Sequence, residues 1–135
     1  MEKLKDILYV KWQQAAELND FVKGDEYYQT LRQMNHAPAG ISFTMGLWYR
    51  QQQQYEQALA AFSHSLLVDL SQNGEILYEM ANTYSEMGQD QQASILYARA
   101  IDIQPDLLDA YFEYGRLLGR MGQIILARQQ FCQVV

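Results

Sequence analysis

Small and large apolar residues recur along the chain at intervals of 35 and then 34 residues. An alanine is followed four residues later by an aromatic residue at Ala58 and Phe62, Ala93 and Tyr97, and Ala127 and Phe131. Twelve residues before each alanine stands another small residue, namely Gly46, Ala81 or Gly115. Small residues on two helices let their backbones approach closely, and large residues at helical spacing fill the grooves around them. The pattern therefore predicts three copies of an antiparallel helical hairpin.

Residues that stop or turn a helix fall between these segments. Gly88 and Gly122 lie between the two predicted helices of the second and third copies, where glycine readily adopts a left-handed backbone. Pro105 ends the second copy, because proline cannot continue a helix. Gln53 holds the turn position of the first copy, within four consecutive glutamines, at an expected strain of up to about 1 kcal/mol. This run is thus predicted to be a turn between helices, with a disordered polar tract as the alternative.

These residues resemble the tetratricopeptide repeat, a helical hairpin of about 34 residues. The matching positions are Ser42, Met45, Gly46, Tyr49, Ala58, Phe62 and Ser65; Leu77, Met80, Ala81, Tyr84, Ala93, Tyr97, Ala100 and Pro105; and Tyr111, Tyr114, Gly115, Leu118, Ala127, Phe131 and Val134. The resemblance divides the chain into repeats at residues 39–73, 74–107 and 108–135, the last one incomplete. It implies an all-α fold, a right-handed α-α superhelix of stacked hairpins.

Residues 1–38 are expected to form an N-terminal helical hairpin that caps this stack. Apolar residues at three- and four-residue steps predict an amphipathic helix over residues 3–22. Gly24-Asp25 then predicts a stop and a new cap, and residues 26–35 read as a second, shorter helix that ends before Pro38. No residue of this segment matches the small positions of the repeats well, so it is either a cap or a degenerate repeat.

Both ends of the stack raise the question of self-association. The N-terminal hairpin covers the first repeat, as such stacks require, or it pairs with a second copy through Trp12 and its neighbours. At the other end the last repeat leaves apolar residues without an expected neighbour: Ile124, Ile125, Phe131 and Val134. Either the sequence is a fragment of a longer array or another chain covers this end, so a homodimer remains open.

Composition narrows the range of partners and compartments. The 135 residues suit one domain, and the net charge of −6 with a pI near 4.7 argues against nucleic acid and against anionic membranes. No stretch of 18 apolar residues occurs, so no membrane insertion is expected. Cys132 is the one cysteine, which excludes an intramolecular disulfide and fits the cytoplasm. A periplasmic protein whose leader has been removed would look the same.

Sequence motifs for catalysis, cofactors and metals are absent. The two histidines, His36 and His64, have no cysteine near them and show no metal-ligand spacing. No phosphate-binding loop, dinucleotide fingerprint or nucleophile elbow occurs. His64 is expected on a solvated outer face, and Cys132 has no base placed to activate it. We therefore expect a protein that is not an enzyme and holds no cofactor or metal.

The family resemblance implies that the first helices of successive repeats line a concave groove that binds partners. Carried over by position, the groove residues are Phe43, Leu47, Arg50, Tyr78, Asn82, Phe112, Arg116 and Arg120, flanked by Gln51, Glu75, Ser85, Glu86 and Asp109. Phe43, Tyr78 and Phe112 hold one position in consecutive repeats and would form an aromatic row. The alternative is that these aromatic rings pack against neighbouring helices. Aromatic and arginine anchors with polar neighbours suit an extended or helical peptide.

The expected function is a non-catalytic protein–protein interaction module, adaptor or chaperone-like, that binds a partner peptide in this groove. Some repeats of this family hold a peptide's terminal carboxylate with lysines and asparagines. Here Phe43 and Leu47 stand at such positions, and Asp109 and Glu113 stand where cations would be, so that mode is not expected. Two alternatives remain: a structural repeat that assembles through its ends, and a protein similar in outline to bacterial secretion chaperones.

Overall fold

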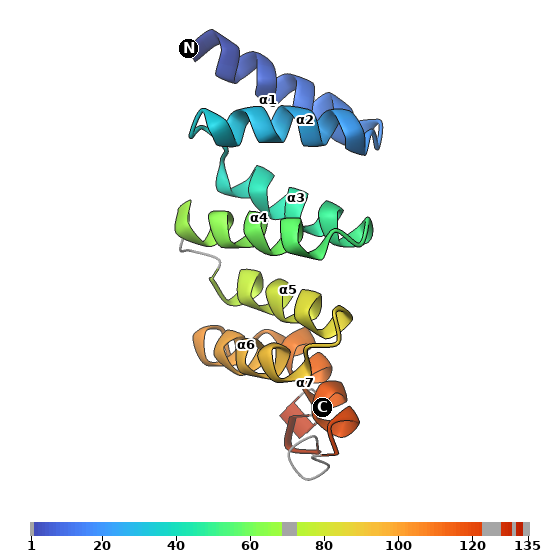
Figure 1. The fold of residues 1–135 in the computed structure, drawn as a ribbon. Coiled ribbons are helices and arrows are strands. Elements are labelled where there is room, and N and C mark those ends of the chain that lie inside the picture. Colours follow the sequence, from blue (N-terminus) through green and yellow to red (C-terminus); the bar gives the residue numbers. More distant parts are fainter. Residues whose placement is uncertain (1, 69–72, 123–127, 131, 134–135) are drawn as a thin grey trace.

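The computed structural model describes residues 2–68, 73–122, 128–130, 132 and 133, and these residues form a stack of antiparallel helical hairpins (Figure 1). The helices are α1 (Glu2–Glu17), α2 (Phe21–Gln33), α3 (Ala39–Gln51), α4 (Tyr55–Val68), α5 (Asn73–Glu86), α6 (Asp90–Ile103) and α7 (Leu108–Arg120). Residues 128–130, 132 and 133 are helical as well. The all-α prediction is confirmed.

Contacts follow the order of the chain. Helices α1 and α2, α3 and α4, and α5 and α6 pack as hairpins, and α2, α4 and α6 each contact the first helix of the next pair. The stack accordingly runs from the N-terminal hairpin at the top of Figure 1 to the C-terminal helices at the bottom. In such an array each hairpin buries its apolar face only against its neighbours, so the position of α3, α5 and α7 depends on every hairpin before them.

A left-handed residue makes the turn between the paired helices. Positive φ angles occur at Asn19 (56°), Gln53 (61°), Gly88 (80°) and Gly122 (81°). In the glutamine run, the backbone N–H groups of Gln53 and Gln54 donate to the carbonyls that end α3, at 2.9 Å each. The predicted turn at Gln53 is therefore confirmed, and the glutamines are an ordered connection rather than a disordered tract.

The limits predicted for the N-terminal helices were wrong. Helix α1 ends at Glu17, and Asp20 caps α2 by accepting a hydrogen bond from the backbone N–H of Lys23 at 3.3 Å. Gly24 lies inside α2 and is buried, where a Cβ atom would stand 2.7 Å from Cζ3 of Trp48. Gly24 follows Asn19 by five residues, as Ala58 follows Gln53. Gly24 is thus the small residue of the N-terminal hairpin: it makes room for the Trp48 ring and does not end a helix.

Aromatic side chains seated on small residues form the core of the stack. A Cβ atom at Gly46 on α3 would lie 2.5 Å from Cε1 of Phe62 on α4, so the ring occupies the space above the glycine.

Trp12 is 8% exposed and its indole Nε1–H donates to Sδ of Met45 at 3.1 Å. Trp12 is therefore not available to pair with a second copy, because the ring is buried against α3 of the same chain, whereas self-association through its neighbours on α1 stays a prediction. The C-terminal apolar residues named for the same role lie outside the described residues: Ile124, Ile125, Phe131 and Val134.

A chain of polar contacts joins the first two hairpins within this core. Arg32 donates to the hydroxyl of Tyr28 at 3.1 Å, and Tyr28 donates to Oγ of Ser42 at 2.9 Å. Oγ of Ser42 lies 2.8 Å from Nδ1 of His64. The expected solvated position of His64 was therefore wrong. Burial, and next the positive charge of Arg32, lower the pKa of His64 below its ordinary value of 6.5.

Replacing Gly24 by alanine is predicted to lower the free energy of unfolding by about 2 kcal/mol, because the added methyl group would force the Trp48 ring to move. The matched control is Gly40→Ala, at a helical position with nothing within 4 Å of the added Cβ. That substitution should leave stability unchanged or raise it by up to about 1 kcal/mol. Urea unfolding followed by circular dichroism measures both, and equal effects would contradict the packing of Trp48 on Gly24.

Replacing Gln53 by glycine is predicted to raise the free energy of unfolding by about 0.5 kcal/mol. The left-handed backbone costs an L-residue about 1–2 kcal/mol, which glycine would avoid. Glycine also has more conformational freedom in the unfolded chain, and this opposes part of the stabilisation. Gln52, with φ of −84°, is the control, and its replacement by glycine should destabilise the protein. The same unfolding experiment would refute the strain at Gln53 if both glycine variants were destabilised alike.

Acidification is predicted to weaken the protein through His64. Because its pKa is lowered in the folded state, the unfolded chain takes up a proton first, so stability is lost as pH falls below about 6.5. His64→Asn keeps an oxygen acceptor near Ser42 and does not titrate, so the difference between the two unfolding curves isolates this histidine. Wild type should lose stability relative to the variant as the pH falls below about 6.5. Parallel pH profiles would show that His64 does not contribute.

Candidate functional site

A groove with a cavity volume of about 540 Å³ opens between α3, α5 and α7. Helix α5 contributes Tyr78, Asn82, Ser85 and Glu86, which recur at helical spacing and so share one face of that helix. Helix α7 contributes Glu113, Arg116, Leu117 and Arg120 in the same way, and Arg50 and Tyr97 complete the lining. The stack of hairpins thus brings side chains from four helices to one hollow.

Five of the eight residues assigned to the groove from the sequence line this hollow: Arg50, Tyr78, Asn82, Arg116 and Arg120. Phe43 and Leu47 are partly buried against the core of the first hairpins, and the Phe43 ring centroid lies 5.8 Å from that of Phe62. Phe112 is 46% exposed on α7 and is not among the lining residues. Of the three aromatic residues at one repeat position, only Tyr78 therefore faces the hollow.

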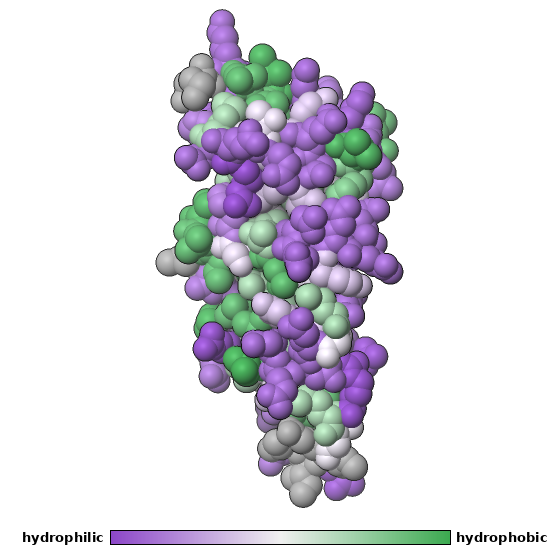
Figure 2. All heavy atoms as spheres, viewed as in Figure 1, coloured by the Kyte–Doolittle hydropathy of each residue, from purple (hydrophilic) through white to green (hydrophobic). Residues whose placement is uncertain are grey.

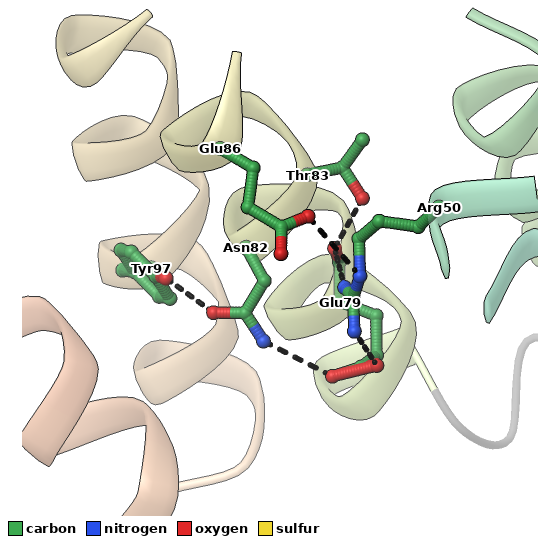
Figure 3. Close-up of polar contacts among 6 residues, drawn as sticks. All are labelled: Arg50, Glu79, Asn82, Thr83, Glu86 and Tyr97. Carbon is green, nitrogen blue, oxygen red and sulfur yellow. Dashed lines mark hydrogen bonds and ion pairs between the residues drawn. The ribbon is translucent and has the colours of Figure 1, made fainter. Parts of the chain in front are cut away.

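Arg50 connects the first helix of one hairpin to the first helix of the next (Figure 3). Its guanidinium group donates to the backbone carbonyl of Glu79 at 3.1 Å and to Oε2 of the same residue at 3.2 Å. Its Nε also lies 3.4 Å from Oε2 of Glu86. The side chains of Arg50 and Glu79 are 18% and 13% exposed, so this ion pair is partly withdrawn from water. Arg50 therefore holds α3 against α5 at the floor of the groove.

Asn82 lies at the centre of the lining and is held on both sides of its amide group (Figure 3). Its Nδ2 donates to Oε1 of Glu79 at 3.1 Å, and its Oδ1 accepts a hydrogen bond from the hydroxyl of Tyr97. These two bonds fix the orientation of the amide. Asn82 also makes a hydrogen bond with the side chain of Tyr78, and because a carboxamide carries two donors, both N–H groups have a partner within the chain.

Three tyrosine rings pack against one another at the groove, and two of them, Tyr78 and Tyr97, line it. The ring centroid of Tyr97 lies 6.1 Å from that of Tyr78 and 6.1 Å from that of Tyr114, which stacks at an interplanar angle of 28°. Burial, and next the carboxylates of Glu113, Glu79 and Asp109, raise the pKa of Tyr78, although a hydrogen bond with Asn82 opposes them. Burial also raises the pKa values of Tyr97 and Tyr114. The hydroxyl groups therefore stay protonated and neutral.

The two arginines of α7 are paired within the chain. Arg120 lies 2.6 Å from Oδ1 of Asp90 and donates to Oγ of Ser85 at 3.1 Å. Arg116 lies 3.3 Å from Oε2 of Glu113 one turn earlier on the same helix. Both pairs are exposed to water, with arginine side chains 53% and 61% exposed. Consequently the groove offers hydrogen-bonding groups and a tyrosine ring rather than an uncompensated cationic site.

One serine–histidine pair lies apart from the groove. Ser42 and His64 approach as a nucleophile and a base would, but Ser42 is 0% exposed and lies within the packed hairpins. No three His, Cys, Asp or Glu residues gather as metal ligands within the described ranges. No helix among the described residues is long and apolar enough to cross a bilayer.

Sequence reasoning missed three residues of the lining: Tyr97, Glu113 and Leu117. Tyr97 belongs to the second helix of its hairpin and was assigned only to packing, yet its hydroxyl reaches the groove floor through Asn82. Glu113 and Leu117 lie on the same helix face as Arg116 and Arg120, at steps of three and four residues. That spacing was the signal that could have found them.

Comparisons with known proteins point to one family. Two sequence models described as tetratricopeptide repeat match residues 39–106 and residues 96–129. No curated protein matches the sequence. A crystal structure of MamA protein is similar with a TM-score of 0.87 and 17% identity, over 99% of this chain and 73% of that one.

Two further solved structures share the arrangement of helices. A tetratricopeptide repeat protein from Parabacteroides merdae has a TM-score of 0.86 and 21% identity, over 98% of this chain and 52% of that one. The first such domain of Spaghetti (RPAP3), bound to the HSP90 peptide SRMEEVD, has a TM-score of 0.67 and 18% identity, over 71% and 77%. At these identities the likeness establishes the fold, a right-handed superhelix of helical hairpins. Since the first model covers half of the sequence, the chain belongs to the tetratricopeptide repeat family.

Proposed function

We propose that this protein is a non-catalytic binding module, adaptor or chaperone-like, that holds an extended segment of a partner protein in the groove between α3, α5 and α7. The observation that carries this proposal is the convergence of five expected groove residues on one hollow of about 540 Å³. That volume lies within the range of about 300–1,000 Å³ that is usual for ligand sites.

The lining supplies what the backbone of an extended peptide requires. The hydroxyl hydrogen of Ser85, whose oxygen accepts from Arg120, can donate to a peptide carbonyl. Glu86, with a side chain 51% exposed, can accept from a peptide N–H. Tyr78 offers an aromatic ring beside them, and aromatic side chains are frequent anchors of interfaces. Because Asn82 and Tyr78 are already held by neighbours, little side-chain freedom remains to be lost on binding.

A similar fold does not imply the same ligand. The RPAP3 domain is bound to the acidic peptide SRMEEVD. In this chain Phe43 and Leu47, at positions where the family resemblance would place lysine and asparagine, pack against the core. The groove arginines are each paired with a carboxylate of the chain. We therefore do not propose that this protein binds a peptide of that type.

Self-association is a second candidate, because α1 leaves apolar side chains exposed. Leu4, Ile7 and Val10 are 47%, 50% and 55% exposed at three-residue steps along this helix. Figure 2 shows hydrophobic side chains gathered at the top of the molecule, over the first turns of α1. A structural repeat that pairs through this face would need no ligand in the groove.

The groove proposal predicts that Ser85→Trp abolishes peptide binding, because an indole ring on α5 would fill the hollow that Ser85 lines. The matched control is Ser63→Trp, an exposed position on α4 that is not among the groove residues. Immobilised wild type, Ser85→Trp and Ser63→Trp proteins are each panned against a displayed library of random extended peptides. Wild type and Ser63→Trp should capture the same peptides, and Ser85→Trp should capture none.

Circular dichroism first has to show that both tryptophan variants keep the helical signal of the wild type. Capture of the same peptides by all three proteins would overturn the groove proposal. Failure of all three to capture any peptide, together with a dimer in sedimentation that Val10→Asp converts to a monomer, would establish the α1 candidate instead.

A further inference from the structure

We infer that the partner segment is basic, with a lysine or arginine side chain seated against the Tyr78 ring and the carboxylates of Glu75 and Asp109. This inference rests on the proposed function and adds the chemical class of the ligand. Its basis is the balance of positive and negative charges in and beside the groove, and which of these charges already have a partner within the chain.

Carboxylates outnumber cations at this site. The groove is lined by three arginines, Arg50, Arg116 and Arg120, and each is paired with a carboxylate of the chain. The carboxylates in these pairs are Glu79, Glu86, Asp90 and Glu113. Within the described residues no ion pair joins Glu75 or Asp109 to a cation. Six carboxylates against three arginines leave a local charge of −3, on a chain whose net charge is −6.

The two remaining carboxylates stand on the two helices beside the groove, Glu75 in the first turn of α5 and Asp109 in the first turn of α7. Glu75 lies three residues before Tyr78 on α5, so the two side chains share a face of that helix. Asp109 lies in the first turn of α7, and its charge reaches the Tyr78 hydroxyl, as does that of Glu113. Both Glu75 and Asp109 are exposed to water. A cation placed between α5 and α7 would therefore meet one carboxylate on each side.

The tyrosine ring completes a site for a cation. Its hydroxyl is neutral, and the face of an aromatic ring attracts an ammonium or guanidinium group by its quadrupole. Tyr78 is held in place by its contact with Tyr97, whose ring is buried. A lysine or arginine side chain could then lay its methylene groups along the ring and keep its charged end between the carboxylates. A basic segment would also be drawn to the site by the net negative charge of the chain.

An acidic segment would find less favourable chemistry. To bind a groove arginine it would have to displace Glu79, Glu113 or Asp90, and the displaced carboxylate would lose its partner. The remaining charge of the site would repel it as well. The charges of the groove therefore favour a basic segment over an acidic one.

The first test uses the peptides recovered from the displayed library. Sequences captured by the wild type and by Ser63→Trp, but not by Ser85→Trp, should be enriched in lysine and arginine relative to the library. Recovery of acidic or neutral sequences would overturn this inference while leaving the proposed function intact. Recovery of no groove-dependent peptide would instead remove the proposed function itself, and the inference with it.

The second test measures the two carboxylates. One recovered basic peptide is synthesised with a fluorescent label, and its Kd is determined for the wild type and for the double variant Glu75→Gln, Asp109→Asn, which breaks no ion pair of the described chain. We expect Kd to rise about fivefold, with a weaker salt dependence, because two exposed charge pairs are lost.

The control is the double variant Glu56→Gln, Asp102→Asn, which removes the same charge from exposed positions on α4 and α6 outside the groove. It should change Kd by less than about twofold. An equal rise of Kd in both variants would show that net charge alone attracts the peptide, and an unchanged Kd in the groove variant would show that these carboxylates do not bind it. Either result would overturn the inferred seat of the cation.

Discussion

The close approach of helices at residues without large side chains is the constraint on which this structure depends. Within the first repeat the Phe62 ring lies directly over Gly46, and between the first two hairpins the Trp48 ring lies over Gly24. The same device therefore operates both inside a hairpin and between neighbours. Because each hairpin buries its apolar face only against the adjacent ones, a shift at one such contact would be passed to every helix that follows.

The groove is a consequence of that stacking, and polar contacts fix its shape. Arg50 joins α3 to α5 through Glu79, Asn82 joins Glu79 to Tyr97, and Arg120 joins α7 to α6 through Asp90. These bonds use up much of the hydrogen-bonding and charge capacity that a sequence reading would assign to a ligand. What remains for a partner is a serine hydroxyl, an exposed carboxylate on either side and the ring of Tyr78. In a groove of this kind, the groups that can select a partner are those that make no hydrogen bond or ion pair within the fold itself.

Several sequence predictions held because they rest on local chemistry. Turns at Gln53, Gly88 and Gly122 were correct, since a left-handed residue between two helical patterns has few alternatives. The turn at Asn19 was missed, and Gly24 was misread as a stop, because a glycine looks the same whether it ends a helix or admits a neighbouring ring. Trp12 and His64 were misplaced for a related reason: the partners that bury them, Met45 and Ser42, are 33 and 22 residues away in the chain.

The sequence by itself determined the helical hairpins, the repeat family and seven of the ten lining residues of the groove, because repeat positions carry over from one hairpin to the next. Only the tertiary structure decided which side chains are committed and which are available. Phe43 and Tyr78 hold the same repeat position and pack beside Phe62 and Tyr97 respectively, yet only Tyr78 lines the groove. Likewise Arg50 reads as a ligand-binding cation until Glu79 is placed beside it. The pair of Arg50 and Glu79 joins two different repeats, and the spacing within one repeat contains no information about it.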